Sequence, residues 1–429
     1  MPINLDNVTN IMLGNTPVEQ VTDSQGNVLW SSAVDPSTVY FYVEDVSGSA
    51  NTLSITKSNS LAPTIEVFYS TDQQNWSSMG NTDTTAITAT VPANSKLYLK
   101  ATSNAWGSSG NSTPSNTINT SGNCNVGGNI MSLLYGDNFT GQTTFPAGST
   151  CNFNLLFNGL KVVNANNLIL PATTLVERCY SDMFKNCTNL VTIPALPATT
   201  LATNCYNCMF DVCTSLTTVP TDLLPVTTIA GSCYRGMFRN CSSLTTAPTL
   251  PATTLDNGCY NQMFSGCSSL TTAPVLPATT LTSNCYREMF SGCSSLTTAP
   301  TLPATTLGNS CYYKMFSGCS SLTTAPATLP ATTLLESCYR EMFSGCSSLT
   351  TAPVLPATTM ASRCYDRMFM NCAALNTITT YAQDVSLSGC LTDWVYNVAA
   401  QGDFYNLGGA TYTSGRSGIP TGWTEHNSL

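Results

Sequence analysis

Apolar residues recur along this chain in one repeated block, and the spacing of that block predicts the architecture. The block runs Cys-Tyr-x-x-Met-Phe-x-x-Cys-x-x-Leu and begins at Cys179, Cys205, Cys233, Cys259, Cys285, Cys311, Cys338 and Cys364. Successive blocks start 26, 28, 26, 26, 26, 27 and 26 residues apart. A fixed period of about 20–50 residues is typical of solenoids, in which each coil packs mainly on its neighbours. We therefore expect a stack of coils.

Within one coil, the apolar positions predict a short helix followed by extended chain. Cys285, Tyr286, Met289, Phe290 and Cys293 fall at i, i+1, i+4, i+5 and i+8, which is the stripe of a helix of about two turns. The Leu-Thr-Thr that follows favours a short strand. The prolines after it lack amide donors and should bracket a corner, beyond which the chain returns in an extended conformation.

A glycine is expected to end this helix. Gly292 follows the aromatic pair, and the same place holds Gly or Asn in all the other coils but one. Because Gly and Asn tolerate positive φ best, this position is predicted to be left-handed. Val212 takes the place in the remaining coil, so we expect the turn of that coil to differ.

The Met-Phe-x-x-Cys-x-x-Leu-Thr-x-x-Pro pattern resembles the BspA-type leucine-rich repeats, a class found in cell-surface and phage adhesion proteins. The resemblance covers about residues 151–375. It implies a curved leucine-rich-repeat β/α solenoid used for recognition, with no catalytic residues to carry over. The first coil is degenerate, with Leu156, Phe157 and Leu160 in the places of Met, Phe and Cys, which brings the coils to about nine.

Residues 1–32 form a small unit ahead of the repeats. Short apolar runs alternate there with Gly-containing turns and predict a β hairpin or meander. A unit so small is unstable alone, so it should anchor on a partner, on copies of itself or on the next domain. It resembles the N-terminal segments of phage tail and virion structural proteins in a motif formed by Asn10, Gly14, Val18, Val21, Gly26 and Trp30.

Residues 33–122 predict an immunoglobulin-like β-sandwich with Trp76 in its core. Turn residues at sandwich spacing separate candidate strands at Val39–Val43, Thr52–Thr56, Thr64–Tyr69, Ala86–Val91 and Lys96–Ala101. Residues 123–150 are predicted to be linker and solenoid N-cap, because Thr113–Val126 is rich in Ser, Thr, Asn, Pro and Gly.

The solenoid is expected over residues 151–378 and a C-terminal cap over 379–429. A cap is needed because the last coil would otherwise expose its apolar face. A capping helix is predicted from the apolar positions Leu387, Trp394, Val395 and Val398. His426, the single histidine of the chain, lies in a polar tail and is expected to be solvated.

The composition narrows the classes of partner. Only 9% of the 429 residues are charged and the net charge is −9, which argues against nucleic acid, since phosphate binding takes clustered Lys and Arg. No apolar run approaches about 20 residues, so no membrane insertion is expected. Residues 1–14 lack the basic start and apolar core of a signal peptide, so conventional secretion is not expected unless a leader has been removed.

Twenty cysteines raise the question of disulfides and metals. Each coil carries two, eight residues apart and at fixed phase with Phe and Leu, which favours free thiols that fill the core. A spacing of eight is not a zinc motif. Cys205, Cys208 and Cys213 form one local cluster, interpreted as core thiols with a stray exposed Cys208 rather than as a metal or redox site. Assembly in a reducing cytoplasm would leave the thiols free.

Little in the sequence indicates catalysis. A single histidine argues against His-based triads and most zinc sites. There is no P-loop, dinucleotide-binding fingerprint or HExxH motif. The acidic residues Asp256, Glu288, Glu336 and Glu341 occupy variable slots of the repeats and are interpreted as solvated surface. We expect no enzyme, no cofactor and no metal.

Recognition has better candidates. The two slots between Cys-Tyr and Met-Phe vary most among the coils and place on one face Arg235, Arg287, Tyr313, Lys314, Arg340 and Arg367. Arg and Tyr are enriched at binding hot spots, although this face could equally be a solvated surface that keeps the solenoid soluble. A second candidate is a ladder of hydroxyls that could meet sugars or form a plain polar face: Thr271, Thr297, Thr323 and Thr350.

Together these features favour a non-enzymatic virion appendage, such as a phage head or tail fibre or decoration. In this hypothesis the N-terminal unit binds other virion proteins, the sandwich is a spacer, and the solenoid adheres to a glycan or protein of the host surface. The small N-terminal unit also favours a homo-oligomer. The alternatives are a bacterial cell-surface leucine-rich-repeat adhesin and a purely architectural virion decoration.

Overall fold

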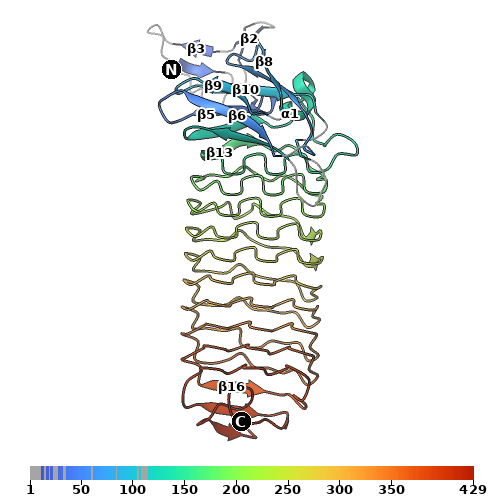
Figure 1. Ribbon diagram of the computed structural model, residues 1–429, viewed down its shortest axis with the longest axis vertical. Coiled ribbons are helices and arrows are strands. Elements are labelled where there is room, and N and C mark those ends of the chain that lie inside the picture. Colours follow the sequence, from blue (N-terminus) through green and yellow to red (C-terminus); the bar gives the residue numbers. More distant parts are fainter. Residues whose placement is uncertain are drawn as a thin grey trace.

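The computed structural model describes residues 35–58, 61–83, 85–103, 106–107 and 115–429, together with the backbone of four short strands between residues 11 and 31. The molecule is elongated, with sheets at one end and a stack of coils that runs from them to the C-terminus (Figure 1). Regular structure in this described part is mostly β, and its single α-helix has four residues.

The four short strands near the N-terminus pair as two antiparallel hairpins, β1 with β2 and β3 with β4. Their bounds are β1 (Ile11–Leu13), β2 (Thr16–Val18), β3 (Gln20–Thr22) and β4 (Val28–Ser31). These pairs match the hairpin alternative expected for residues 1–32. Asn10, Gly14 and Gly26 of the virion-like motif lie outside the described residues.

Residues 36–129 contribute to two sheets, and we call them the two-sheet unit. One sheet has the strand order β13-β12-β5-β10-β7-β8 and the other the order β11-β6-β9. Only the pairing of β12 with β13 is parallel. The bounds are β5 (Tyr42–Asp45), β6 (Asn51–Lys57), β7 (Glu66–Ser70), β8 (Ser77–Asn81), β9 (Ile87–Val91), β10 (Lys96–Ala101), β11 (Asn116–Thr120), β12 (Cys124–Asn129) and β13 (Val162–Ile169).

Alternate side chains of both sheets meet in one core. Leu97 and Leu99 of β10 are fully buried, and so are Leu53 and Ile55 of β6 and Ile118 of β11. This is the period-two pattern that predicted most of these strands. The strands that the sequence did not predict are β8, β11 and β12, which contain few apolar residues.

Two expectations for this unit are wrong. Trp76 is only half-buried and packs on Tyr40 with ring centroids 4.8 Å apart. The buried tryptophan is Trp106, whose Nε1 donates to the carbonyl of Leu133 over 2.8 Å. The linker expected over residues 113–126 instead contains β11 and the start of β12.

Strand β12 joins the two-sheet unit to the coils without a break. It pairs with β5 on one side and with β13, the first strand of the coils, on the other. Its two glycines permit this approach: a side chain at Gly127 would overlap the ring of Tyr42, and Gly128 has a φ of +74° with the carbonyl of Tyr40 where a Cβ would lie. Three short helices complete the junction, α1 (Ser132–Tyr135), η1 (Pro36–Thr38) and η2 (Gly136–Asn138).

The block predicted as a helix is instead a ribbon of successive turns in every coil, which we call the turn ribbon. In one coil the amides of Tyr286, Glu288 and Phe290 donate to carbonyls of the next coil over 2.7–2.9 Å. The amides between them, of Arg287 and Met289, donate to the carbonyl three residues back. Since each of these amides has a partner, the ribbon satisfies its backbone without a helix. The predicted β/α alternation is therefore wrong for the coils.

Left-handed residues recur at every fourth position of the turn ribbon. Asn284, Glu288 and Gly292 have φ angles of 58°, 56° and 76°. The prediction of positive φ at the Gly or Asn position is confirmed. The prediction that the coil of Val212 would differ is wrong, because Val212 keeps a φ of 64°. A β-branched residue disfavours this conformation, so the stacking of the coils imposes it.

Repeated side chains form ladders through the core. Phenylalanine rings stack from Phe157 to Phe369 with centroids 5.1–5.8 Å apart. Tyrosine rings stack from Tyr180 to Tyr365 at 5.6–6.1 Å. Phe41 extends the first ladder into the two-sheet unit, and Trp394 closes both ladders at the other end. One core therefore runs through the whole stack.

The twenty cysteines are all free thiols, and nineteen are buried. The second cysteine of a coil donates to the phenylalanine carbonyl of the preceding coil, as Cys293 does to Phe264 over 3.1 Å. The first cysteines stack on one another, and the Sγ atoms of Cys205 and Cys233 are 2.8 Å apart. Cys208, the expected exception, is half-buried. The thiols thus pack the core, as predicted.

The rest of each coil is extended and is held by sparser contacts. Parallel bridges of single residues link Thr272 to Thr298 and Thr298 to Thr324. Two of the coils widen such a bridge into the short strands β14 (Thr228–Ile229) and β15 (Thr254–Leu255). The expected strand after the turn ribbon is thus reduced to a single bridged residue such as Thr298, and β14 and β15 lie ahead of the turn ribbons of their coils.

A parallel sheet closes the stack in place of the predicted capping helix. Its strands, in spatial order, are β16 (Thr377–Thr380), β17 (Asp403–Asn406) and β18 (Thr424–His426). Trp394 and Val395 are buried as expected, but they lie in a further turn ribbon that also carries Cys390, and Leu387 is exposed. The helical interpretation failed here for the same reason as in the coils.

His426 is not a solvated tail residue. It lies in β18 and stacks on Tyr405 with ring centroids 4.8 Å apart. Its Nε2 is 2.8 Å from Oδ1 of Asp403 in the neighbouring strand. The cap therefore uses the single histidine of the chain in its sheet.

Candidate interaction surface

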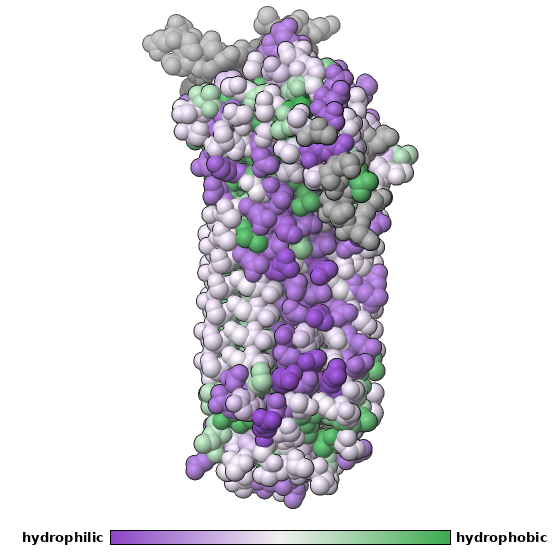
Figure 2. Space-filling view, in the orientation of Figure 1, coloured by the Kyte–Doolittle hydropathy of each residue, from purple (hydrophilic) through white to green (hydrophobic). Residues whose placement is uncertain are grey.

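The variable slots of the turn ribbons form one continuous surface, which we call the charged ladder. Its members lie between the Cys-Tyr and Met-Phe pairs or directly after the phenylalanine, and all but Asp211 and Asp366 are at least partly exposed. Polar side chains gather in a stripe along the stack, beside a paler face (Figure 2). The ladder comprises Asp182, Lys185, Asp211, Arg235, Arg239, Gln262, Arg287, Glu288, Tyr313, Lys314, Arg340, Glu341, Asp366 and Arg367.

All six residues predicted as candidates belong to this ladder, but they are not equally available. Arg235 is exposed and forms no ion pair with the described residues. The other five are partly buried and contact neighbouring members of the ladder. The sequence thus showed that these residues recur in matching slots and missed the contacts between them.

Tyr313 lies between arginines of the two adjacent coils. The guanidinium carbon of Arg287 is 4.4 Å from the ring centroid and that of Arg340 is 5.5 Å away. The ammonium of Lys314 is 5.3 Å from the same centroid. Cation–π contacts of this kind stabilise by about 0.5–1 kcal/mol at exposed sites. The central part of the ladder is therefore preassembled.

Acidic residues pair with the cations around Tyr313. Lys314 lies 3.2 Å from Glu341, and Arg340 lies 3.0 Å from Asp366 in the next coil. Arg367 lies 3.5 Å from the same Asp366 carboxylate. Burial raises the pKa of Asp366, although both arginines oppose the shift. These acids hold the cations in place and offset their charge.

Two of the acidic residues interpreted as solvated surface belong to the ladder instead. Glu341 pairs with Lys314, and Glu288 pairs with Arg287 over 3.0 Å and accepts a hydrogen bond from Gln262 over 2.7 Å. Asp256 and Glu336 are exposed, as expected. The difference arises because Glu288 and Glu341 occupy the same slots as the cations.

A second ionic cluster escaped the sequence analysis. Asp211 has only 1% of its side chain exposed, and its two oxygens accept hydrogen bonds of 3.0 and 2.6 Å from Arg239. Lys185 lies 4.0 Å from the same carboxylate. These residues follow the phenylalanine in three consecutive coils, where the next four coils have serine. That run of charged replacements was the available signal.

The ladder as a whole offers donors and acceptors of both signs rather than a basic patch. All its cations but Arg235 are already paired with carboxylates, so a polyanion would gain little from them. A partner with hydroxyls, amides or mixed charges can exchange hydrogen bonds along the ladder at little cost in side-chain ordering.

The threonine ladder presents fewer free hydroxyls than its sequence indicates. Thr271, Thr297, Thr323 and Thr350 are exposed. The hydroxyl of Thr323 donates to the carbonyl of Thr297 over 3.2 Å, which ties it to the preceding coil. Part of this array therefore serves the stacking of the coils.

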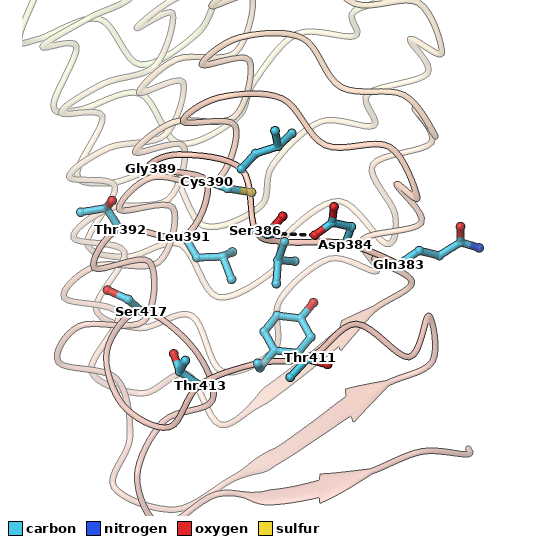
Figure 3. Close-up of a pocket in the computed structure, with 13 residues that line it drawn as sticks. Gln383, Asp384, Ser386, Gly389, Cys390, Leu391, Thr392, Thr411, Thr413 and Ser417 are labelled. Carbon is cyan, nitrogen blue, oxygen red and sulfur yellow. Dashed lines mark hydrogen bonds between the residues drawn. The ribbon is translucent and has the colours of Figure 1, made fainter.

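Two pockets lie at opposite ends of the molecule. One of about 430 Å³ in the C-terminal cap is lined by Asp384, Ser386, Cys390 and other residues (Figure 3). The other, of about 370 Å³ in the two-sheet unit, contains Trp76 and an ion pair of 2.7 Å between Lys100 and Asp137.

Neither pocket gathers the groups of a recognisable reaction centre. Within the described residues, no cluster of three or more His, Cys, Asp or Glu side chains is arranged to hold a metal ion. Among the same residues, no helix has the length and hydropathy needed to cross a membrane.

Comparisons with known proteins agree with the repeat structure. A family model described as the BspA type leucine rich repeat region matches in six copies, over residues 156–297 and 259–388. Together these ranges span more than half of the chain. No curated protein and no solved structure matches.

Proposed function

Because the chain belongs to the BspA-type leucine-rich repeat family, we propose that it is a non-enzymatic adhesion protein whose coils present the binding surface. A leucine-rich repeat region itself suggests a role in protein interaction or adhesion. The observation that carries the proposal is the charged ladder, in which variable polar side chains stand side by side on a backbone that every coil repeats. A frame so regular loses little conformational entropy on binding.

The proposed ligand is a glycan or protein of a host surface. The pairing of the cations disfavours nucleic acid, and the exposed polar groups favour a partner rich in hydroxyls or amides. Binding centres on the six residues of the turn ribbons, which are Arg235, Arg287, Tyr313, Lys314, Arg340 and Arg367.

The proposed location is the surface of a phage virion, as a head or tail fibre or decoration. Residues 1–32 bind other virion proteins, and the two sheets serve as an immunoglobulin-like spacer. About nine coils then project outward, and the small N-terminal unit favours a homo-oligomer. The virion-like motif supports this placement. The position of β2 and β3 at one end of the molecule and of β16 at the other supports it too (Figure 1).

The repeat family fits a bacterial cell-surface adhesin equally well, and a purely architectural decoration is the third candidate. Deleting residues 1–32 separates the placements. Under the virion proposal, the truncated protein fails to join particles while its coils still bind the host. Incorporation at full occupancy would exclude anchoring through this unit.

The binding surface is tested with the full-length protein on a glycan array and on host cells. A triple variant with Arg287→Ala, Tyr313→Ala and Arg340→Ala is expected to lose binding. The matched control on the other face, with Thr271→Ala, Thr297→Ala and Thr323→Ala, is expected to keep it. If only the control loses binding, the threonine ladder is the adhesive face. If the unaltered protein binds neither glycans nor cells, the architectural role is favoured.

A further inference from the structure

We propose that Cys364 and Cys390 form an oxidative modification site, in which a hydroperoxide that enters the C-terminal pocket joins the two thiols in a disulfide. The two cysteines occupy the same place in successive coils, and their Sγ atoms are 3.4 Å apart. The amide of Tyr365 donates to the carbonyl of Cys390 over 3.1 Å, so the two backbones run as neighbouring strands. Adjacent strands lie about 4.7–4.9 Å apart, within the Cα separation of about 4.4–6.8 Å that a disulfide spans.

The pocket distinguishes this pair from the other stacked cysteines. Cys390 lines the pocket of about 430 Å³ in the cap. Figure 3 shows its side chain directed toward Ser386 and Asp384. The rim is open to solvent, since Asp384, Ser386 and Leu387 are all exposed. The Cys390 side chain is itself only 1% exposed, so a small peroxide must approach its sulfur from within this pocket.

A closer pair inside the stack supplies the comparison. Cys205 and Cys233 have their Sγ atoms only 2.8 Å apart, and both side chains are fully buried between coils, as that of Cys364 is. Neither lines the cap pocket. If proximity alone decided the reaction, this pair would react first. If access decides it, Cys364 and Cys390 react first.

Position assigns the roles of the two thiols, because Cys390 lines the pocket and Cys364 does not. Either sulfur can be the donor in their 3.4 Å contact, which lowers the pKa of Cys364 and raises the pKa of Cys390. The Cys390 sulfur attacks a peroxide oxygen, the O–O bond breaks, and hydroxide leaves and is protonated to water. The Cys364 thiolate then attacks the Cys390 sulfenic acid, the S–S bond forms, and the S–O bond breaks to release a second water. In balance, two thiols and one hydrogen peroxide give one disulfide and two waters.

The disulfide would fasten the cap to the last coil. A stack of coils opens most readily at its ends, where each coil has a neighbour on one side only. The thiols would stay reduced in a reducing cytoplasm and would be oxidised outside it. The inference concerns the cap alone and does not depend on what the charged ladder binds.

The test uses the full-length reduced protein and hydrogen peroxide. After treatment, free thiols are alkylated, the protein is digested, and cross-linked peptides are measured by mass spectrometry. The Cys364–Cys390 peptide is expected first, and its rate should increase with pH because the reacting Cys390 must deprotonate. Cys205 and Cys233 should be recovered as alkylated thiols. Half-buried Cys208 reports that the peroxide reached the protein.

Variants separate access from proximity. Cys390→Ser should abolish the cross-link, whereas Cys233→Ser should leave it unchanged. Slower hydrogen exchange at β17 and β18 after oxidation would show that the cap is fastened. The proposal is overturned if Cys208 is oxidised while Cys364 and Cys390 stay reduced, or if Cys205 and Cys233 cross-link as fast. Both outcomes are read on the unaltered protein, so a variant that fails to fold does not decide the matter.

Discussion

The two-sheet unit and the stack of coils both bury a continuous apolar core, but they use different kinds of contact. In the two-sheet unit, core side chains have unlike neighbours, as Trp106 does when its indole donates to the carbonyl of Leu133. In the stack, a side chain contacts copies of itself, as Phe290 does with Phe264 and Phe316 at 5.7 Å on either side. A defect should therefore stay local in the stack and spread through the two-sheet unit.

The largest expected effect tests this difference directly. Phe290→Ala removes a ring from the middle of the ladder and should cost about 3–5 kcal/mol in the free energy of local opening. Hydrogen exchange should speed up in that coil and its neighbours and stay unchanged near β16. Leu99→Ala, in β10 of the two-sheet unit, should cost about 2–5 kcal/mol and speed up exchange across both sheets. Equal loss of protection along the whole stack after Phe290→Ala would contradict the local picture.

The next effect concerns the ionic cluster of the first coils. Arg239→Ala leaves the buried carboxylate of Asp211 without its two hydrogen bonds and should destabilise those coils by about 1–3 kcal/mol. Arg235→Ala, four residues earlier and exposed, should change stability by no more than about 0.5 kcal/mol. Urea midpoints of the two variants check the contrast. Similar midpoints would mean that the hydrogen bonds from Arg239 to Asp211 do not stabilise these coils.

A smaller gain is expected at the strained turn. Val212→Asn puts a residue that tolerates positive φ at a backbone angle of 64° and should stabilise its coil by about 1 kcal/mol. The reverse change, Gly292→Val, should destabilise a regular coil by a similar amount or more. Hydrogen exchange of the affected turn ribbons measures both. A Val212→Asn variant less stable than the parent would show that packing of the valine outweighs its strain.

The coils show why the sequence predicted the stack and not its backbone. The spacing of the blocks required side chains to recur in register, and that part was correct. Inside a block, however, Cys285 to Cys293 spans nine residues, too short to separate a period of 3.6 from one of four. Only hydrogen bonds to the next coil distinguish the two conformations. The middle left-handed position, occupied by Glu288 in this coil, carries a glycine only in the coil of Gly236, so it gave no consistent signal.

Contacts between distant parts of the chain also decide the junction between the two-sheet unit and the coils, and the candidate surface. Gly127 and Gly128 indicate a linker when only composition is considered, yet they allow β12 to approach Tyr42 and Tyr40. The six candidate residues occupy the same two adjacent slots of their coils, which the sequence shows plainly. The pairing of Arg340 with Asp366 spans two coils and becomes visible only when the coils are stacked. Aligning the coils could have revealed this pair, because Asp366 occupies in the next coil the slot that Arg340 occupies in its own.

The smallest predicted effect compares one carboxylate from each region, and the signs are opposite. Hydrogen bonds from Lys100 and Tyr40 lower the pKa of Asp137 in the two-sheet unit, whereas burial raises the pKa of Asp366 in the stack. Asp137 therefore contributes stability above its unfolded pKa of about 3.9, and this contribution is lost as the pH falls through the lower folded pKa. Asp366 instead imposes a cost at neutral pH that fades as the pH falls through its raised folded pKa.

Two asparagine variants make the comparison measurable. At pH 7, Asp137→Asn should lower the urea midpoint, while Asp366→Asn should raise it slightly, because the relief from burial exceeds the loss of its ion pairs with Arg340 and Arg367. The advantage of Asp366→Asn should shrink first on acidification, because its folded pKa lies above the usual value. The deficit of Asp137→Asn should persist to a lower pH. If both variants lower the urea midpoint at pH 7, then the ion pairs of Asp366 stabilise the stack, just as the Lys100–Asp137 pair stabilises the two-sheet unit.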